Sequence, residues 1–344
     1  MFRDKRYEAY FYIFSLCLCV SVFYFYYSAK GRVFLLLTYS CQILVLFLGK
    51  PLAMDQREAI ISKVFEQQQS NGCWKMLDVG HKYFPVYQHY VPNFKATLWT
   101  LILLADLELD PSDERVKRPL ETIKNHFFDS KQGIYSLGDD HFPIPCLNGN
   151  LIYLDAYFNP SLSEKSLSVI NFFSKNQRFD DGIYNEPQSI YCKNTSCFGK
   201  HTCYWGVIKL LKGLSFIPEK ERTSEAKSLL ERCIAFVLHH HVCFSSRNPQ
   251  KPLSNNIEKL GFPCMYKSNY LEILWLLKRE GVYSRNVDEA LKLLQSKQQP
   301  DGTWLLEKQI ANMVAGVGSE NRPNPFVTQR ANEILSFFYN SAST

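Results

Sequence analysis

The stretch Gln298-Gln299-Pro300-Asp301-Gly302-Thr303-Trp304 ends an amphipathic segment of this 344-residue chain, and its pattern, Gln-x-x-x-Gly-x-Trp, decides the fold. The pattern returns near the other end of the chain as Gln68-Gln69-Ser70-Asn71-Gly72-Cys73-Trp74. Between them lie the shorter units Gly133-Ile134-Tyr135 and Gly182-Ile183-Tyr184, and the last gap has room for a degenerate unit around residues 239–244. A spacing of about 50–60 residues is typical of a helical repeat architecture.

A charged amphipathic segment precedes each of these turns and predicts the outer member of a helix pair. In residues 223–241 the apolar side chains follow helical spacing, while most charged side chains fall elsewhere. Asp113 and Thr223 provide start signals for two of these helices. The predicted outer helices span residues 54–69, 113–128, 161–177, 223–241 and 286–298.

The segment after each turn is apolar on nearly every side, which indicates a helix buried on every side. These predicted inner helices span residues 96–108, 147–158, 202–217, 269–281 and 327–339. The alternation favours an all-α fold with about five helical hairpins in two concentric rings, although the pattern leaves closure of the rings open. Glycine at each turn supplies the backbone freedom that the reversal needs.

Residues 1–53 form a hydrophobic leader, and we expect the repeat domain to span residues 54–344. The apolar runs 7–29 and 33–49 have lengths that suit membrane-spanning helices, so they predict a transmembrane hairpin. Alternatively, translation begins at Met54 and the leader is a mis-called start. The protein is expected to be membrane-associated if the leader is real and cytoplasmic otherwise.

Composition limits the classes of partner. The chain is 46% hydrophobic and 15% aromatic, enough to bury a large core, and its net charge of +6 is spread along the sequence. Without a long Lys/Arg run, nucleic-acid binding is not expected. Eleven cysteines in a chain of this length indicate mostly reduced thiols. The sequence gives no indication of oligomeric state.

The repeat units resemble those of the α/α-toroid superfamily, which contains squalene-hopene (oxidosqualene) cyclases, terpene cyclases and the β subunits of protein prenyltransferases. The chain is most similar to uncharacterised prokaryotic prenyltransferase-repeat proteins over about residues 54–340. Four segments carry that similarity: Leu98-Trp99-Thr100-Leu101, Pro145-Cys146-Leu147-Asn148-Gly149-Asn150, Ser196-Cys197-Phe198-Gly199-Lys200-His201-Thr202-Cys203 and Gly261-Phe262-Pro263. The resemblance implies an α/α toroid and an isoprenoid- or lipid-related enzyme, a transferase or a cyclase/isomerase, with its substrate in a central apolar cavity.

The sequence departs from the family in its chemistry. The Asp-x-Asp-Asp acid of the cyclases, the Asp-Asp-x-x-Asp magnesium element and the Asp-x-Cys zinc ligands of the prenyltransferases are all absent. The alternative function is therefore a non-catalytic toroid that binds a lipid, a peptide or a partner protein. Aromatic residues on or near the predicted inner helices could line an apolar cavity or simply pack between helices: Trp99, Tyr153, Tyr157, Tyr204, Trp205, Tyr266, Tyr270 and Trp275.

Two carboxylates on predicted inner helices, Asp155 and Glu272, are candidate catalytic acids. A buried carboxyl with a raised pKa could protonate an isoprenoid substrate. The alternative is that each pairs with a base. For Asp106, near a helix end, a salt bridge or solvent exposure is expected.

A group of thiol and imidazole side chains is a candidate zinc site, because these are the ligands that zinc prefers. His201 and Cys203 could share a metal only where the helix begins between or after them. The alternatives are a thiol-based catalytic site or a purely structural role. The candidate ligands are Cys146, Cys192, Cys197, His201 and Cys203.

Overall fold

The computed structural model describes residues 56–91, 93–138, 142–181, 197 and 202–340, together with the backbone of four short strands between residues 13 and 35. The chain divides into two compact units, Met1–Ala59 and Ile60–Thr344, which we describe separately.

The described residues of the first unit form two antiparallel hairpins. They pair β1 (Ile13–Leu16) with β2 (Cys19–Val22) and β3 (Tyr24–Ser28) with β4 (Gly31–Leu35). The prediction of membrane-spanning helices over residues 7–29 and 33–49 is wrong for these residues. They are rich in Phe, Tyr and Val, and aromatic and β-branched side chains favour strands. The rest of both runs lies outside the described residues. In the part of the chain that is described, we find no helix with the length and apolarity needed to cross a membrane.

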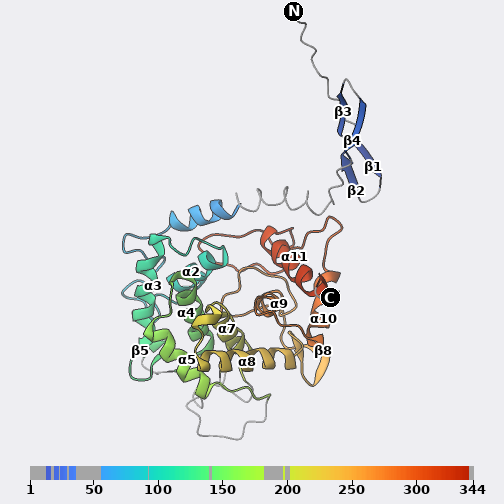
Figure 1. The fold of residues 1–344 in the computed structure, drawn as a ribbon. Helices are drawn as coiled ribbons and strands as arrows, with labels where there is room; N and C mark the ends of the chain where they lie inside the picture. Colours follow the sequence, from blue (N-terminus) through green and yellow to red (C-terminus); the bar gives the residue numbers. More distant parts are fainter. Residues whose placement is uncertain are drawn as a thin grey trace, which may run out of the picture. The chain divides into compact units, whose positions relative to one another are not determined.

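The second unit is mostly helical and alternates two kinds of helix, as predicted. The charged outer kind comprises helical residues 60–65 and then α3 (Glu114–Phe127), α5 (Glu164–Asn176), α8 (Ser224–His239) and α10 (Asp288–Ser296). The apolar inner kind comprises α2 (Thr97–Asp106), α4 (Pro145–Phe158), α7 (Tyr204–Ser215), α9 (Tyr270–Arg279) and α11 (Pro325–Asn340). In Figure 1, α3, α5, α8 and α10 lie at the periphery of this unit, with α2, α4, α7 and α9 inside.

The two Gln-x-x-x-Gly-x-Trp units fold in the same way. Gly72 and Gly302 have φ values of 84° and 82°, in the left-handed region that a side chain would strain. Each tryptophan is fully buried, and its indole N–H donates to a carbonyl of the preceding outer helix or its end, from Trp74 to Val64 and from Trp304 to Leu294, both at 2.8 Å. The predicted corner role is therefore confirmed for both units.

The other turns use different residues for the same reversal. Gly133 also has a positive φ, and the short hairpin of β5 (Phe128–Asp129) and β6 (Ile134–Tyr135) follows α3. After α8 the left-handed residues are His241 and Val242, where we expected a degenerate unit, and the hairpin is β7 (Phe244–Ser245) with β8 (Asn248–Pro252). Gly182 lies outside the described residues.

Side-chain caps fix where several helices begin. Asp113 accepts a hydrogen bond from the Arg115 backbone N–H, and Thr223 accepts one from that of Ala226, so both predicted start signals are confirmed. Asn269 caps α9 in the same way.

The closest helix contact joins α4 to α7. A Cβ built on Gly149 would lie 2.3 Å from the Lys209 carbonyl carbon, and one on Gly213 would lie 2.6 Å from the Gly149 oxygen. Glycine thus lets two backbones touch at the centre of the unit.

A second contact joins the beginning and the end of this unit: the Gln67 side-chain amide donates to the carbonyl of Val314, 247 residues later, at 2.8 Å.

Candidate functional site

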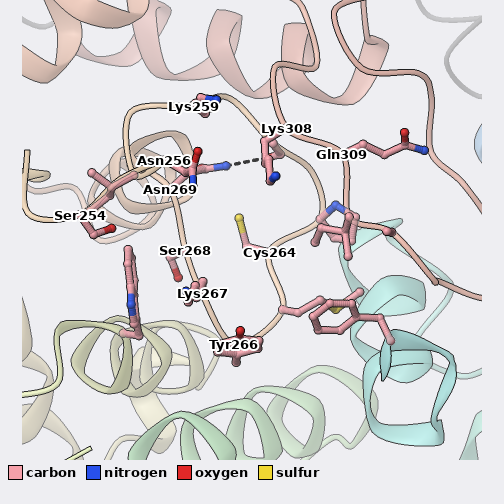
Figure 2. Close-up of a pocket in the computed structure, with 18 of the residues that line it drawn as sticks. Ser254, Asn256, Lys259, Cys264, Tyr266, Lys267, Ser268, Asn269, Lys308 and Gln309 are labelled. Atoms are coloured by element: carbon pink, nitrogen blue, oxygen red, sulfur yellow. Dashed lines mark hydrogen bonds between the residues drawn. The ribbon is translucent and has the colours of Figure 1, made fainter. Parts of the chain in front are cut away.

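A pocket of about 430 Å³ lies beside the N-terminal ends of α7 and α9. Its wall is formed by residues 254–257, 259, 261 and 263–269, together with residues 93–94, 205 and 308–312. The loop between the β7–β8 hairpin and α9 therefore supplies most of the lining, as Figure 2 shows.

One side of the pocket is aromatic. Phe94 and Tyr266 line it with their rings stacked and centroids 6.1 Å apart. The buried Trp99 ring does not line the pocket; it packs behind these two, 6.3 Å from Tyr266 and 5.5 Å from Phe94. Met265 and Ile310 add apolar surface. Such a surface binds hydrocarbon, because covering it removes apolar area from water.

The rim of the pocket is basic. Lys259, Lys267 and Lys308 line it, and all three are exposed. No acidic residue is found among the lining residues in the part of the chain that the structure describes. A ligand with a negative charge is therefore favoured over a neutral or cationic one of the same shape.

Buried polar side chains hold the pocket loop in place. The Lys209 ammonium donates to the Cys264 carbonyl at 3.0 Å, and the Asn150 amide donates to that of Met265 at 3.4 Å. Asn269 donates across the loop to the Gly261 carbonyl at 2.9 Å, the dashed line in Figure 2. Burial raises the pKa of the Cys264 thiol to about 12, so this thiol is protonated at neutral pH.

Glu272 lies beneath this loop, not in the pocket wall. Its carboxylate is fully buried and contacts the ammonium groups of Lys209 at 2.8 Å and Lys212 at 2.9 Å. Burial alone would raise its pKa, but the two lysines outweigh burial and lower the pKa to about 2. For Glu272 the structure shows the alternative that the sequence left open, pairing with a base.

The ion pair belongs to a central network with members on all the inner helices. Lys212 of α7 also contacts Asp106 of α2 at 2.7 Å, which confirms the expected salt bridge, and the Tyr153 hydroxyl of α4 donates to the same carboxylate at 2.9 Å. Arg330 of α11 lies 3.9 Å from Asp106, and its guanidinium stacks on Trp275. Buried ions thus link the inner helices to one another.

Asp155 is also a paired ion. It accepts hydrogen bonds from the Lys124 ammonium at 2.7 Å, the Ser163 hydroxyl at 2.7 Å and the Asn159 amide at 2.8 Å. Burial would raise its pKa, but Lys124 and serine hydrogen bonds lower it. Asp155 therefore links α4 to α3 and to the start of α5, and it too shows the alternative of pairing with a base.

Three of the candidate zinc ligands are described, and they lie near one another. Cys203 is the N-cap of α7, and the Cys197 thiol donates to it; this hydrogen bond is the main cause of its lowered pKa, about 7. Cys146, at the start of α4, is buried and its pKa is raised to about 12. Cys192 and His201 lie outside the described residues. Among the residues that are described, we find no group of three or more Cys, His, Asp or Glu placed to hold a metal ion.

No protein-family model matches the sequence. No curated protein is significantly similar to it. Among solved structures, the chain is similar to the type II terpene cyclase MstE from Scytonema. A variant of MstE in complex with geranylgeranyl dihydroxybenzoate, its substrate, has 13% identity and a TM-score of 0.36 over 87% of this chain and 100% of that one. The MstE apo structure has 12% identity and a TM-score of 0.35, over 83% and 98%. With scores this low, the function is proposed from the residues of this chain.

The sequence points to Trp205 and Tyr266 of the pocket lining, but not to Phe94 or to the position of the pocket. Both aromatics could line an apolar cavity according to the sequence. Nothing in the sequence distinguishes Lys259, Lys267 and Lys308 from other lysines in loops. Their common signal is that all three lie in segments that lead into or away from the inner helices.

Proposed function

We propose that this protein binds an acidic isoprenoid- or lipid-like small molecule in the pocket beside α7 and α9. The observation that carries the proposal is that one pocket of about 430 Å³ combines the aromatic side chains of Phe94, Trp205 and Tyr266 with three lysines at its rim. This volume lies in the usual range for small-molecule sites.

The scaffold that we propose is the α/α toroid. Two observations support it: the strict alternation of charged outer and apolar inner helices, and the identical turns at Gly72 and Gly302. The contact between Gln67 and Val314 further supports closure of the rings, because it joins the beginning and the end of the helical unit.

Binding without cyclisation is favoured over the enzymatic alternative. Protonation of an alkene needs a neutral carboxylic acid, and both candidate acids, Asp155 and Glu272, are ionised and paired with buried lysines. Incubation with farnesyl or geranylgeranyl substrates, followed by mass spectrometry of the extract, separates the two functions. We expect the substrate back unchanged; a new product would establish the transferase or cyclase function instead.

The binding proposal is tested with farnesyl phosphate and farnesol. Because Tyr266 contributes aromatic surface to the pocket, Tyr266→Ala should weaken farnesyl phosphate binding about tenfold. Lys259→Gln together with Lys308→Gln should reduce the preference for the phosphate over the alcohol by a similar factor, while farnesol affinity stays within twofold. Isothermal titration calorimetry measures both.

Matched controls are Tyr283→Ala, an exposed tyrosine that does not line the pocket, and Lys292→Gln on α10. Both should leave either affinity unchanged. Equal effects of Tyr266→Ala and Tyr283→Ala would reject the pocket as the binding site.

We also retain the zinc site, formed by Cys146, Cys192, Cys197, His201 and Cys203, as a proposal. The adjacency of the Cys197 and Cys203 thiols supports it, since two neighbouring sulfurs are half of a tetrahedral ligand set. Metal analysis of the purified full chain should find about one zinc per molecule. Cys197→Ser and His201→Ala should each lose it, whereas Cys233→Ser in the core of α8 should not. Metal-free wild-type protein would contradict the proposal.

A further inference from the structure

A second pocket, of about 410 Å³, adjoins the first, because Trp205 and Ser254 line both. Its wall comes from the start of α7, the end of α8 and the β7–β8 hairpin with the segment that follows it. Asp181 and Thr202 complete it.

Aromatic rings line one side of this pocket. The His240 ring packs edge-on against Phe236 at 4.7 Å and against Tyr204 at 5.3 Å, and the Trp205 ring lies 6.1 Å from Tyr204. The Tyr204 hydroxyl donates to the Val242 carbonyl at 2.6 Å, which fixes the orientation of its ring. A planar ring can pack against such a surface in offset or edge-to-face contact.

The mouth of the pocket is basic. Arg247 and Lys251 line it, and both are exposed. The Arg247 guanidinium donates to the backbone carbonyl of Asp181 at 2.7 Å, which uses one of its five N–H groups and leaves others for a ligand. The Asp181 carboxylate accepts from the Ser246 hydroxyl and lies 3.9 Å from His240 Nε2.

His240 is buried, and one of its ring nitrogens lacks a hydrogen-bond partner among the described residues. Its side chain is 3% exposed, and among the described residues Nδ1 has no hydrogen-bond partner. Burial lowers its pKa; His239 and His241 add to that effect and Asp181 opposes it, so the ring is neutral at pH 7. A buried polar atom without a partner is costly, and a ligand that supplied the missing hydrogen bond would gain affinity.

We propose that this second pocket binds a planar aromatic carboxylate that carries a ring hydroxyl. Its ring packs against Tyr204, Trp205 and Phe236, and its carboxylate meets Arg247 and Lys251. Its hydroxyl completes the hydrogen bonding of His240. The chemistry of this ligand differs from that of the isoprenoid- or lipid-like ligand, so the inference stands whether or not the first pocket binds as proposed.

The test compares four probes by isothermal titration calorimetry at pH 7: 6-hydroxy-2-naphthoate, 2-naphthoate, cyclohexanecarboxylate and sulfate. We expect one molecule of naphthoate per chain, with cyclohexanecarboxylate and sulfate at least tenfold weaker. The hydroxyl should improve affinity about tenfold, and His240→Phe, which keeps an aromatic ring and removes the nitrogens, should abolish that gain. Arg247→Gln should weaken both naphthoates about tenfold.

Control variants locate the site. Arg285→Gln, an exposed arginine that does not line this pocket, and Tyr266→Ala in the first pocket should leave naphthoate affinity unchanged. Absence of naphthoate binding, equally tight binding of sulfate or cyclohexanecarboxylate, or equal effects of Arg247→Gln and Arg285→Gln would each overturn the proposal. If His240→Phe does not fold, the exposed Arg247→Gln variant and the ranking of the probes still decide.

Discussion

Replacement of Glu272 by glutamine should destabilise the protein by about 3–5 kcal/mol, the usual cost of removing one partner from a buried ion pair. The amide keeps the shape of the side chain but removes the charge that Lys209 and Lys212 share. Lys212 retains Asp106, whereas among the described residues Lys209 retains the Cys264 carbonyl and no carboxylate, so its ammonium remains buried without a counter-ion there.

This loss is measured by urea denaturation of the full chain and by thermal melting, in which a fall of roughly 10 °C is expected for a domain of this size. Glu289→Gln is the matched control, because Glu289 pairs with Lys292 on the exposed face of α10 and should change stability by less than about 0.5 kcal/mol. A Glu272→Gln variant as stable as this control would show that the central network does not hold the inner helices together.

The ion pairs of Glu272 with Lys209 and Lys212 also determine how the stability of the protein depends on pH at the acidic end. The pKa of Glu272 is lowered from 4.5 to about 2 in the folded protein, so the unfolded chain binds the proton more readily. The stabilisation from this carboxylate is present above about pH 4.5 and is lost as the pH falls toward 2. Glu272→Gln should therefore show a shallower decline in stability over that range than the wild type.

Gly149→Ala should cost about 3 kcal/mol, the upper end of the range for overpacking. The new methyl group would lie 2.3 Å from the Lys209 carbonyl carbon and 2.4 Å from its oxygen. Those atoms are backbone, so no rotamer change can relieve the contact, and α4 and α7 must separate. Because Lys209 carries the hydrogen bond to Cys264, the pocket loop should lose order together with the helix contact.

Gly316→Ala is the control, since a methyl group there has no neighbour within 4 Å. Urea denaturation should place it within about 0.5 kcal/mol of the wild type. Hydrogen–deuterium exchange of the backbone amides in residues 261–269 reports on the order of the pocket loop. It should be faster than in the wild type in Gly149→Ala but not in Gly316→Ala. Equal stability of the two variants would mean that α4 and α7 approach less closely than described.

The helices were predictable and the charges were not. Continuous apolar runs placed α2, α4, α7, α9 and α11 within a few residues, because a helix buried on every side is apolar on every side. Lys209 and Lys212 sit inside such a run and look like interruptions of it. Their partners, Glu272 and Asp106, are 63 and 106 residues away, so only the fold shows that the candidate acids are ionised.

The helix prediction failed for the described residues between 13 and 35 for a related reason. Length and apolarity predicted helices, but the same Phe, Tyr and Val residues also have a high propensity for strands. An apolar run without a clear period of 2 or 3.6 residues does not distinguish a helix from a strand. Of the residues that line the pocket, the sequence singled out only aromatic ones. Exposed lysines at a binding site have no sequence pattern that distinguishes them from lysines elsewhere on the surface.

The hydrogen bond from Gln67 to Val314 links two parts of the chain that are synthesised far apart in time. Open stacks of repeats can add units one after another from either end, and each new unit is complete once it covers its neighbour. Here residue 67 makes a contact with a segment 247 residues later in the chain. We therefore expect this contact to form only after residue 314 has left the ribosome.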